Sequence, residues 1–183
     1  MSNKDLFKDI VFRYIKRNGI KQLMDNLEKT DFYKAPASTK HHESYEGGLV
    51  EHSLNVFNQI MKENTLLDKK YDTETLAIVS LFHDVCKVGY YEVSMRNTKD
   101  ESGKWIQVPF YTVNDKFPFG HGEKSVFMIN QFLELTEDEV LAIRWHMNGF
   151  EPKENYQYMS KAYSEVPLAV ILATADLKAT YIK

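Results

Sequence analysis

Apolar residues recur every three to four positions along most of this chain, with polar residues between them. That spacing is typical of α-helices that bury one face. It predicts helices at about 4–17, 20–29, 49–64, 73–86, 123–133, 137–147, 156–163 and 166–181. Local signals support some boundaries: Thr73 is a suitable N-cap, Thr136 and Glu139 form a capping-box pattern, and Pro167 stands in a first turn.

The period changes from helical to alternating between Tyr90 and Asn114. Two alternating runs flank a polar turn at 97–104, and this pattern predicts a β-hairpin at about 90–114. Pro109 indicates an exposed edge, because proline cannot donate to a sheet ladder. The predicted fold class is therefore all-α, a mainly helical bundle with one inserted β-hairpin. The aromatic residues of the hairpin either line a substrate site or pack within the hairpin, which we favour: Tyr91, Trp105, Phe110 and Tyr111.

Length and composition fit one domain. The chain has 183 residues, of which 43% are hydrophobic and 13% aromatic, enough for one packed core. The net charge of −3 lacks the strongly basic signature of a protein that coats nucleic acid. A lone cysteine, Cys86, excludes an intrachain disulfide and is interpreted as a small core residue. Without a secretory signal or a long apolar run, we expect a cytoplasmic protein with no membrane partner.

Six residues that can ligate a metal stand in or against the apolar stretches: His52, His83, Asp84, His121, His146 and Asp176. Burying an imidazole or a carboxylate without a partner is costly. Each residue alone has an ordinary explanation, such as a hydrogen-bonded core histidine or a salt bridge from Asp176 to a lysine or arginine. Together they favour a divalent ion such as manganese, iron, zinc or nickel, which imidazoles and carboxylates ligate.

Two further histidines, His41 and His42, lie in the polar segment 31–48 and are not surrounded by regularly spaced apolar residues. The segment carries Pro36 and ends in the pair Gly47 and Gly48, a composition typical of a loop. We therefore interpret both histidines as solvated loop residues outside the site.

The order of the ligating residues resembles the HD superfamily of metal-dependent phosphohydrolases. The segment 47–53 reads Gly-Gly-Leu-Val-Glu-His-Ser, the doublet His83-Asp84 follows, and Asp176 comes last, so the resemblance spans most of the chain. It implies a single HD-type domain over 1–183, with N-terminal helices and a loop at 1–48 and a metal-binding helical core at 49–183. Where many members read His-Asp-x-Gly-Lys, this chain reads His-Asp-Val-Cys-Lys at 83–87.

The resemblance also implies how the ligands divide. One metal would take His52, His83 and Asp176, a second would take His121 and His146, and Asp84 would bridge the two. This is the pattern of the two-metal subgroup. One or two divalent ions are therefore expected, with manganese, iron, magnesium, nickel and zinc all compatible. The chain lacks the Gly-Tyr-Pro motif of the branch that acts on cyclic dinucleotides, so that substrate is not assigned.

The expected activity is hydrolysis of a phosphate ester by a metal-activated water, because metals supply hydroxide near neutral pH and orient phosphoryl oxygens. Asp84 and Lys87 are the candidate catalytic residues, and Lys87, Lys124 and Arg144 are candidates for binding substrate phosphate. Lys87 has the alternative of an ion pair with Asp84 or a solvated helix end, and the other two have the alternative of a surface role. The helix start at 120–125 would also favour an anion.

The substrate class stays open at this level. A phosphorylated small molecule such as a nucleotide fits the neutral-to-acidic composition best. A 3′–5′ exonuclease on single-stranded RNA or DNA ends would use the same residues. A regulatory module that binds a nucleotide without hydrolysis, or a purely structural polar cluster, are the alternatives from other classes. The oligomeric state is left open.

Overall fold

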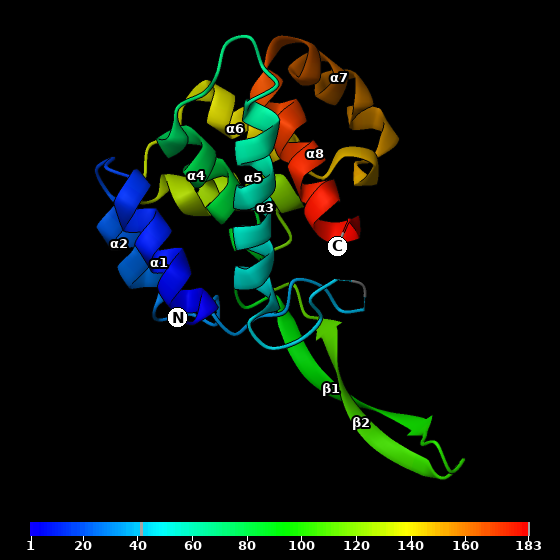
Figure 1. Ribbon diagram of the computed structural model, residues 1–183. Helices are drawn as coiled ribbons and strands as arrows, with labels where there is room; N and C mark the ends of the chain where they lie inside the picture. The colour runs from blue at the N-terminus through cyan, green and yellow to red at the C-terminus, as the bar shows by residue number, and fades with distance from the viewer. Residues whose placement is uncertain (41, 183) are drawn as a thin grey trace.

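Helices make up most of the chain, as the apolar stripes predict. The computed structural model describes residues 1–40 and 42–182, in which eight α-helices form the body (Figure 1). They are α1 (Asn3–Tyr14), α2 (Ile20–Leu27), α3 (Gly48–Asn64), α4 (Thr73–Phe82), α5 (His121–Asn130), α6 (Glu137–Trp145), α7 (Tyr156–Glu165) and α8 (Pro167–Tyr181). Short 3₁₀ turns are η1 (Val85–Lys87), η2 (Asn148–Phe150) and η3 (Lys153–Asn155). The predicted fold class is confirmed.

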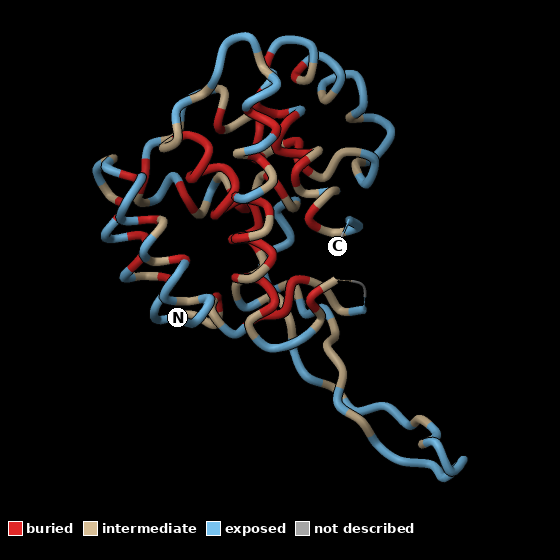
Figure 2. The backbone as a smooth tube through the Cα atoms, in the orientation of Figure 1, coloured by how far each residue is buried: buried red, intermediate tan, exposed pale blue. Residues whose placement is uncertain are grey.

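Helix α3 lies at the centre of the body and packs most extensively against α8 and α4. Its apolar side chains Leu49, Val56 and Ile60 are fully buried, and α4 is buried from Thr75 to Phe82. Each such side chain stabilises the fold by roughly 1.5–3 kcal/mol. Figure 2 shows this buried core running through α3, α4, α6 and α8. None of the helices in the described part of the chain is long and apolar enough to cross a bilayer.

The predicted N-cap and the predicted end of α4 both differ from the structure. The N-cap of α4 is Asp72 rather than Thr73, because the Asp72 carboxylate accepts a 2.9 Å hydrogen bond from the amide of Thr75. The same helix ends at Phe82 rather than near 86, since the backbone at Asp84 leaves the α-helical conformation and continues as η1. The early end of α4 places His83 and Asp84 at the point where the chain changes direction.

The capping box at the start of α6 is confirmed. The Thr136 hydroxyl accepts from the amide of Glu139, and the Glu139 carboxylate accepts from the amide of Thr136. Thr136→Ala removes one of these bonds, so we expect the free energy of unfolding to fall by about 1 kcal/mol. Urea denaturation would measure the change, with the exposed neighbour Glu137→Ala as control. Equal stabilities of the two variants would contradict the capping role.

The β-hairpin consists of β1 (Tyr91–Lys99) and β2 (Trp105–Val113), paired antiparallel with Tyr91 opposite Val113 and Lys99 opposite Trp105. The turn is shorter than predicted, because the polar residues 97–99 continue the ladder. The hairpin projects away from the helical body as an arm, and most of it is exposed (Figures 1 and 2). Trp105 is 65% exposed at its far end, so it does not contribute to the core.

Candidate metal centre

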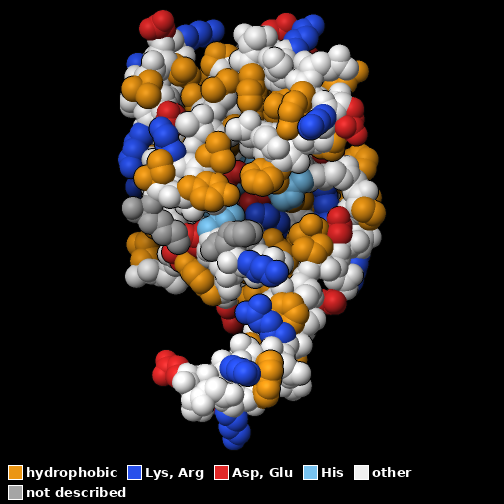
Figure 3. Space-filling model, turned by 90° about the vertical axis from the view of Figure 1, so that its right-hand side faces the viewer, with side chains coloured by type: hydrophobic (Ala, Val, Ile, Leu, Met, Phe, Trp, Pro, Cys, Tyr) orange, Lys and Arg blue, Asp and Glu red, His pale blue; other side chains and the backbone are white. Residues whose placement is uncertain are grey.

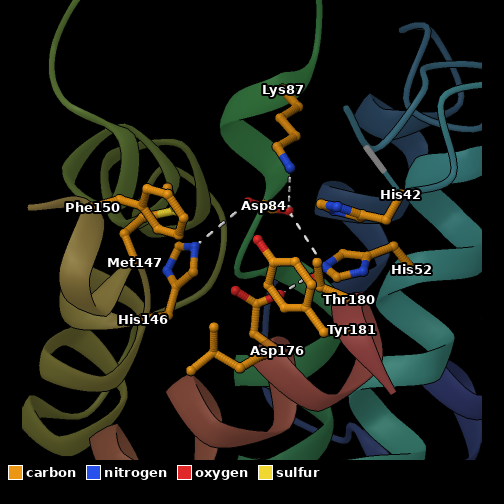
Figure 4. A pocket seen from close by; sticks show the side chains of 11 residues that line it. His42, His52, Asp84, Lys87, His146, Met147, Phe150, Asp176, Thr180 and Tyr181 are labelled. Carbon is orange, nitrogen blue, oxygen red and sulfur yellow. Dashed lines mark hydrogen bonds and ion pairs between the residues drawn. The ribbon is translucent and has the colours of Figure 1, made fainter. Parts of the chain in front are cut away.

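Five chain segments bring six polar side chains to one place in the helical body. His52 comes from α3, and Asp176 comes from α8. The other members stand at helix ends, where side chains can turn toward a common centre: His83, Asp84, His121 and His146. All six residues predicted as ligands therefore meet, and four of them are shown in Figure 4.

Asp84 is the centre of this cluster. Its carboxylate is 4% exposed, and its two oxygens face different histidines. Oδ1 lies 2.7 Å from Nε2 of His121 and 3.5 Å from Nε2 of His146. Oδ2 lies 3.3 Å from Nε2 of His83 and 3.8 Å from Nε2 of His52. The two sides of the carboxylate thus separate the histidines into the pairs that the resemblance implies for a bridging aspartate.

Two of these histidines are oriented by backbone carbonyls. Nδ1 of His83 donates to the carbonyl of Ser80 at 2.8 Å, and Nδ1 of His146 donates to the carbonyl of Ile143 at 2.6 Å. With the proton on Nδ1, a neutral imidazole keeps a lone pair on Nε2. Both Nε2 atoms are buried and form no hydrogen bond among the described residues. Two lone pairs therefore face an ionised carboxylate, an arrangement that a cation between them would stabilise.

His52 and Asp176 complete this side of the centre. Nε2 of His52 lies 2.9 Å from an oxygen of Asp176, and its Nδ1 lies 4.0 Å from the carboxylate of Glu43. The Asp176 side chain is 18% exposed, which is more than its apolar helix predicts, because it faces an open pocket. Two groups of three residues have ligand atoms that lie, within each group, no more than 4.8 Å from one another. They are His52, His83 and Asp84, and His83, His146 and Asp176. These groups could hold a metal ion.

The two carboxyl groups are strongly stabilised in their ionised form. Burial by itself would raise the pKa of Asp84, but the ammonium of Lys87 and the surrounding imidazoles of His83, His121 and His146 hold this pKa well below the usual range. Burial would likewise raise the pKa of Asp176, and the contact with His52 outweighs it, so that this pKa is also lowered. Both side chains are therefore anionic at neutral pH, as metal ligands must be.

His121 and Cys86 form a second group around Asp84. The sulfur of Cys86 lies 3.5 Å from both ring nitrogens of His121, and the three residues have ligand atoms close enough to hold an ion. Burial lowers the pKa of His121, so its imidazole is neutral at pH 7. Burial also raises the pKa of Cys86 to about 12, and the group is thus a neutral thiol. Cys86 is buried, as the sequence predicts, but it also lies beside a candidate ligand.

His42 corrects the sequence-based interpretation, because it is not outside the site. Its ring centroid lies 4.8 Å from that of His52, and its side chain lines the same pocket as Asp84 and Asp176. Burial and the nearby His52 and Lys87 lower the pKa of His42 to about 4. His41, the other histidine predicted to be solvated, lies outside the described residues.

The position of His42 follows from how its loop packs on α3. Gly48 opens α3, and a Cβ at this position would lie 1.9 Å from the carbonyl oxygen of Glu43. The absence of a side chain therefore lets the loop pass directly over the start of the helix that carries His52. The Gly47-Gly48 pair was a signal for this close approach, although it does not say which loop residue enters the site.

Lys87 lies beside Asp84, as one alternative predicted. Its Nζ donates to Oδ2 of Asp84 and to the carbonyl of Ala37, each at 2.7 Å. Burial would lower the pKa of Lys87, but Asp84 more than compensates, so the ammonium form is favoured. Lys87 also lines the pocket, and an ammonium has three hydrogens, of which these bonds use two.

The other two candidate phosphate-binding residues do not line this pocket. Lys124 pairs with Asp115 at 2.8 Å and borders a second hollow together with His121 and Cys86. Arg144 pairs with Glu123 and Glu151, at 2.6 Å and 2.9 Å.

The start of α5 serves packing. The carboxylate of Glu123 folds back toward Gly120, where a Cβ would lie 2.4 Å from its Oε2, so an anion of the chain itself stands at the helix start predicted to favour one. Gly122 allows close packing, since a Cβ there would lie 2.3 Å from the carbonyl oxygen of Arg144. The glycines of this segment thus have a structural explanation.

The pocket over the cluster has an apolar wall. Met147, Phe150, Leu177 and Tyr181 line it together with His42 and Lys87, and Figure 4 shows Met147 and Phe150 beside His146, on the side away from His42. Phe150 is 71% exposed and Tyr181 is 66% exposed, so both aromatic rings are available at the opening. Figure 3 shows histidine and basic side chains at the bottom of this hollow, surrounded by hydrophobic side chains. The hairpin aromatics Trp105, Phe110 and Tyr111 do not line it, and Tyr91 instead donates to the carbonyl of Ala37.

Compared with models of known families, with curated proteins and with solved structures, the chain matches none of them significantly. The resemblance to the HD superfamily therefore depends on the residues themselves and on the cluster that they form.

Proposed function

We propose that this protein is a metal-dependent phosphohydrolase of the HD type that hydrolyses a phosphate ester of a nucleotide or a similar small molecule. The observation that carries the proposal is the pair of buried Nε2 atoms of His83 and His146. Both have their lone pairs directed at Asp84 because their Nδ1 hydrogens are donated to backbone carbonyls. A divalent cation between these nitrogens and the Asp84 carboxylate would give all three groups a partner.

The residues present fit one ion directly and offer partners for a second. His52, His83 and Asp176 would hold an ion on the Oδ2 side of Asp84, and His121 and His146, which stand on Oδ1, would be the partners for the second. Cations held there would supply hydroxide at neutral pH and positive charge for a phosphoryl group. Elemental analysis measures how many ions the protein holds and of which element.

The chain's own residues would bind and orient the ester. Lys87 has one ammonium hydrogen left for a phosphoryl oxygen, and Asp84 holds that ammonium in position. His42, neutral at pH 7, offers a hydrogen bond to an ester oxygen from the other side of the pocket. Phe150 and Tyr181 at the opening suit a planar group such as a nucleobase, which stacks on aromatic rings. The apolar wall also excludes water from part of the pocket.

The test combines metal analysis with a substrate panel. Protein purified without a histidine tag is expected to contain one to two first-row metal ions per chain by elemental analysis. With added manganese it should hydrolyse at least one of a panel of nucleoside mono- and triphosphates, cyclic nucleotides, short RNA and DNA, and an aryl phosphodiester. Preferred turnover of RNA or DNA ends would indicate the exonuclease. Metal-replete protein that binds nucleotides without hydrolysing any substrate would contradict the proposal and favour a regulatory module.

His42 provides a more specific prediction. His42→Ala is expected to lower the turnover of the best substrate by roughly ten- to a hundredfold, the value of one hydrogen bond to a charged group. The metal content should not change, because His83, Asp84 and Asp176 remain. Steady-state kinetics and elemental analysis measure the two quantities. His42→Asn, which retains a hydrogen-bond donor, should lose less activity, and equal activities of wild type and His42→Ala would contradict the role.

A further inference from the structure

The β-hairpin arm has one strand edge that is open to pairing. At its base the amide of Asn114 donates to the carbonyl of Tyr90 at 2.8 Å, and at its turn the amide of Asp100 donates to the carbonyl of Lys104 at 3.0 Å. Both contacts join even-numbered residues, and in the register of the hairpin the even-numbered residues of one strand face those of the other, as in the pair Ser94 and Phe110. In an antiparallel ladder only every second pair is hydrogen-bonded. The odd-numbered residues of both strands therefore direct their backbone groups outward.

The two outer edges are not equivalent. On β2 the outward set includes Pro109, which has no amide hydrogen and therefore interrupts that edge at its middle. On β1 the outward set contains Val93, Met95 and Asn97, each with an amide and a carbonyl, and no hydrogen bond to these groups is formed by the described residues. β1 runs for 9 residues without an interruption. Natural proteins rarely leave such an edge uncovered.

The side chains on the same residues are also unpartnered. Val93 is 63% exposed and Met95 is 56% exposed, and the register puts Trp105 and Val113 on the same face, 65% and 52% exposed. An isolated two-stranded hairpin is marginally stable in water. A further strand on the β1 edge would satisfy the outward backbone groups and cover part of this face.

We propose that the β1 edge pairs with β1 of a second copy of this chain, antiparallel about a twofold axis at Ser94, so that two arms form a four-stranded sheet. In this register Val93 stands opposite Met95 of the second copy. Glu92, which is exposed, stands opposite the exposed Arg96 of the second copy. The twofold axis repeats both pairs, so the edge is complementary to itself in charge as well as in apolar contact.

The charge of the arm favours a second copy over a polyanion. Residues 91–113 contain three basic residues, Arg96, Lys99 and Lys104, and three acidic residues, Glu92, Asp100 and Glu101. A nucleic-acid-binding arm would carry an excess of positive charge. This association does not depend on the proposed hydrolase activity.

The first test compares two proline variants by sedimentation velocity over a series of protein concentrations. Wild-type protein is expected to dimerise as its concentration rises. Met95→Pro removes an outward amide from β1 and should weaken dimerisation by on the order of tenfold or more. Gln107→Pro is the matched control, because it removes an outward amide from the β2 edge that Pro109 already interrupts. A monomeric wild type, or equal effects of the two substitutions in variants whose circular dichroism matches the wild type, would overturn the proposal.

Charge reversal tests the register. Glu92→Arg and Arg96→Glu should each weaken dimerisation by on the order of tenfold, because like charges then stand opposite each other. Mixing the two single variants should give a heterodimer, since each now carries the charge that the other needs. The double variant E92R/R96E should dimerise like the wild type. Failure of both the mixture and the double variant to restore the dimer would overturn the pairing about Ser94.

Discussion

Asp84→Asn is expected to abolish stoichiometric metal binding and to lower phosphoester hydrolysis by more than about a hundredfold. Loss of a partner that only supports a ligand already costs roughly ten- to a hundredfold, and Asp84 itself stands between all four histidines of the centre. The amide of asparagine is neutral and would no longer balance a divalent charge. Elemental analysis and steady-state kinetics with added manganese measure the two effects. Retention of the metal by this variant would contradict the assignment.

The same substitution must be separated from a loss of stability. Lys87 is 11% exposed and pairs with Asp84, so Asp84→Asn leaves a nearly buried ammonium without its carboxylate. Breaking a buried ion pair costs about 3–5 kcal/mol. The double variant Asp84→Asn with Lys87→Met removes that ammonium and should regain most of the stability, but neither metal nor activity. Asp25→Asn, at an exposed ion pair on α2, is the control that should change none of these quantities.

Removal of the metal is expected to lower the melting temperature by roughly 5–10 °C. An ion present at a hundredfold excess over its dissociation constant stabilises the folded state by about 2.7 kcal/mol, and each kcal/mol shifts the midpoint of a chain of this size by about 2–4 °C. Without the ion, the lone pairs of His83 and His146 face Asp84 uncompensated. Scanning calorimetry before and after dialysis against a chelator measures the shift.

Two controls make this result specific. Added manganese should restore the original melting temperature, because the site is built from residues that remain folded. The Asp84→Asn protein should show no shift when chelator is added, because it has no ion to lose. An unchanged melting temperature of chelated wild-type protein would instead support a polar cluster with a purely structural role.

The predicted helices and hairpin agree with the structure because their signals are local. The stripe over α3 and the capping box at Thr136 depend on residues within a few positions of each other. The errors are local too: Asp72 and Thr73 are both good caps, and composition alone does not say which carboxylate or hydroxyl reaches the amide of Thr75. The predicted turn of the hairpin begins too early in the chain, because polar residues also occur in exposed strands.

For the site, the sequence by itself determined which six residues could ligate a metal, because polar groups in apolar helices require partners wherever the helices pack. Only the tertiary structure decided which atoms face the centre, since the orientation of His83 and His146 depends on backbone carbonyls at helix ends. It brought His42 into the pocket and engaged Arg144 with two carboxylates outside it, because these contacts join residues from different elements. The open edge of β1 likewise follows from the hydrogen-bond register between the two strands. The alternation of apolar and polar residues does not by itself say which backbone groups point outward.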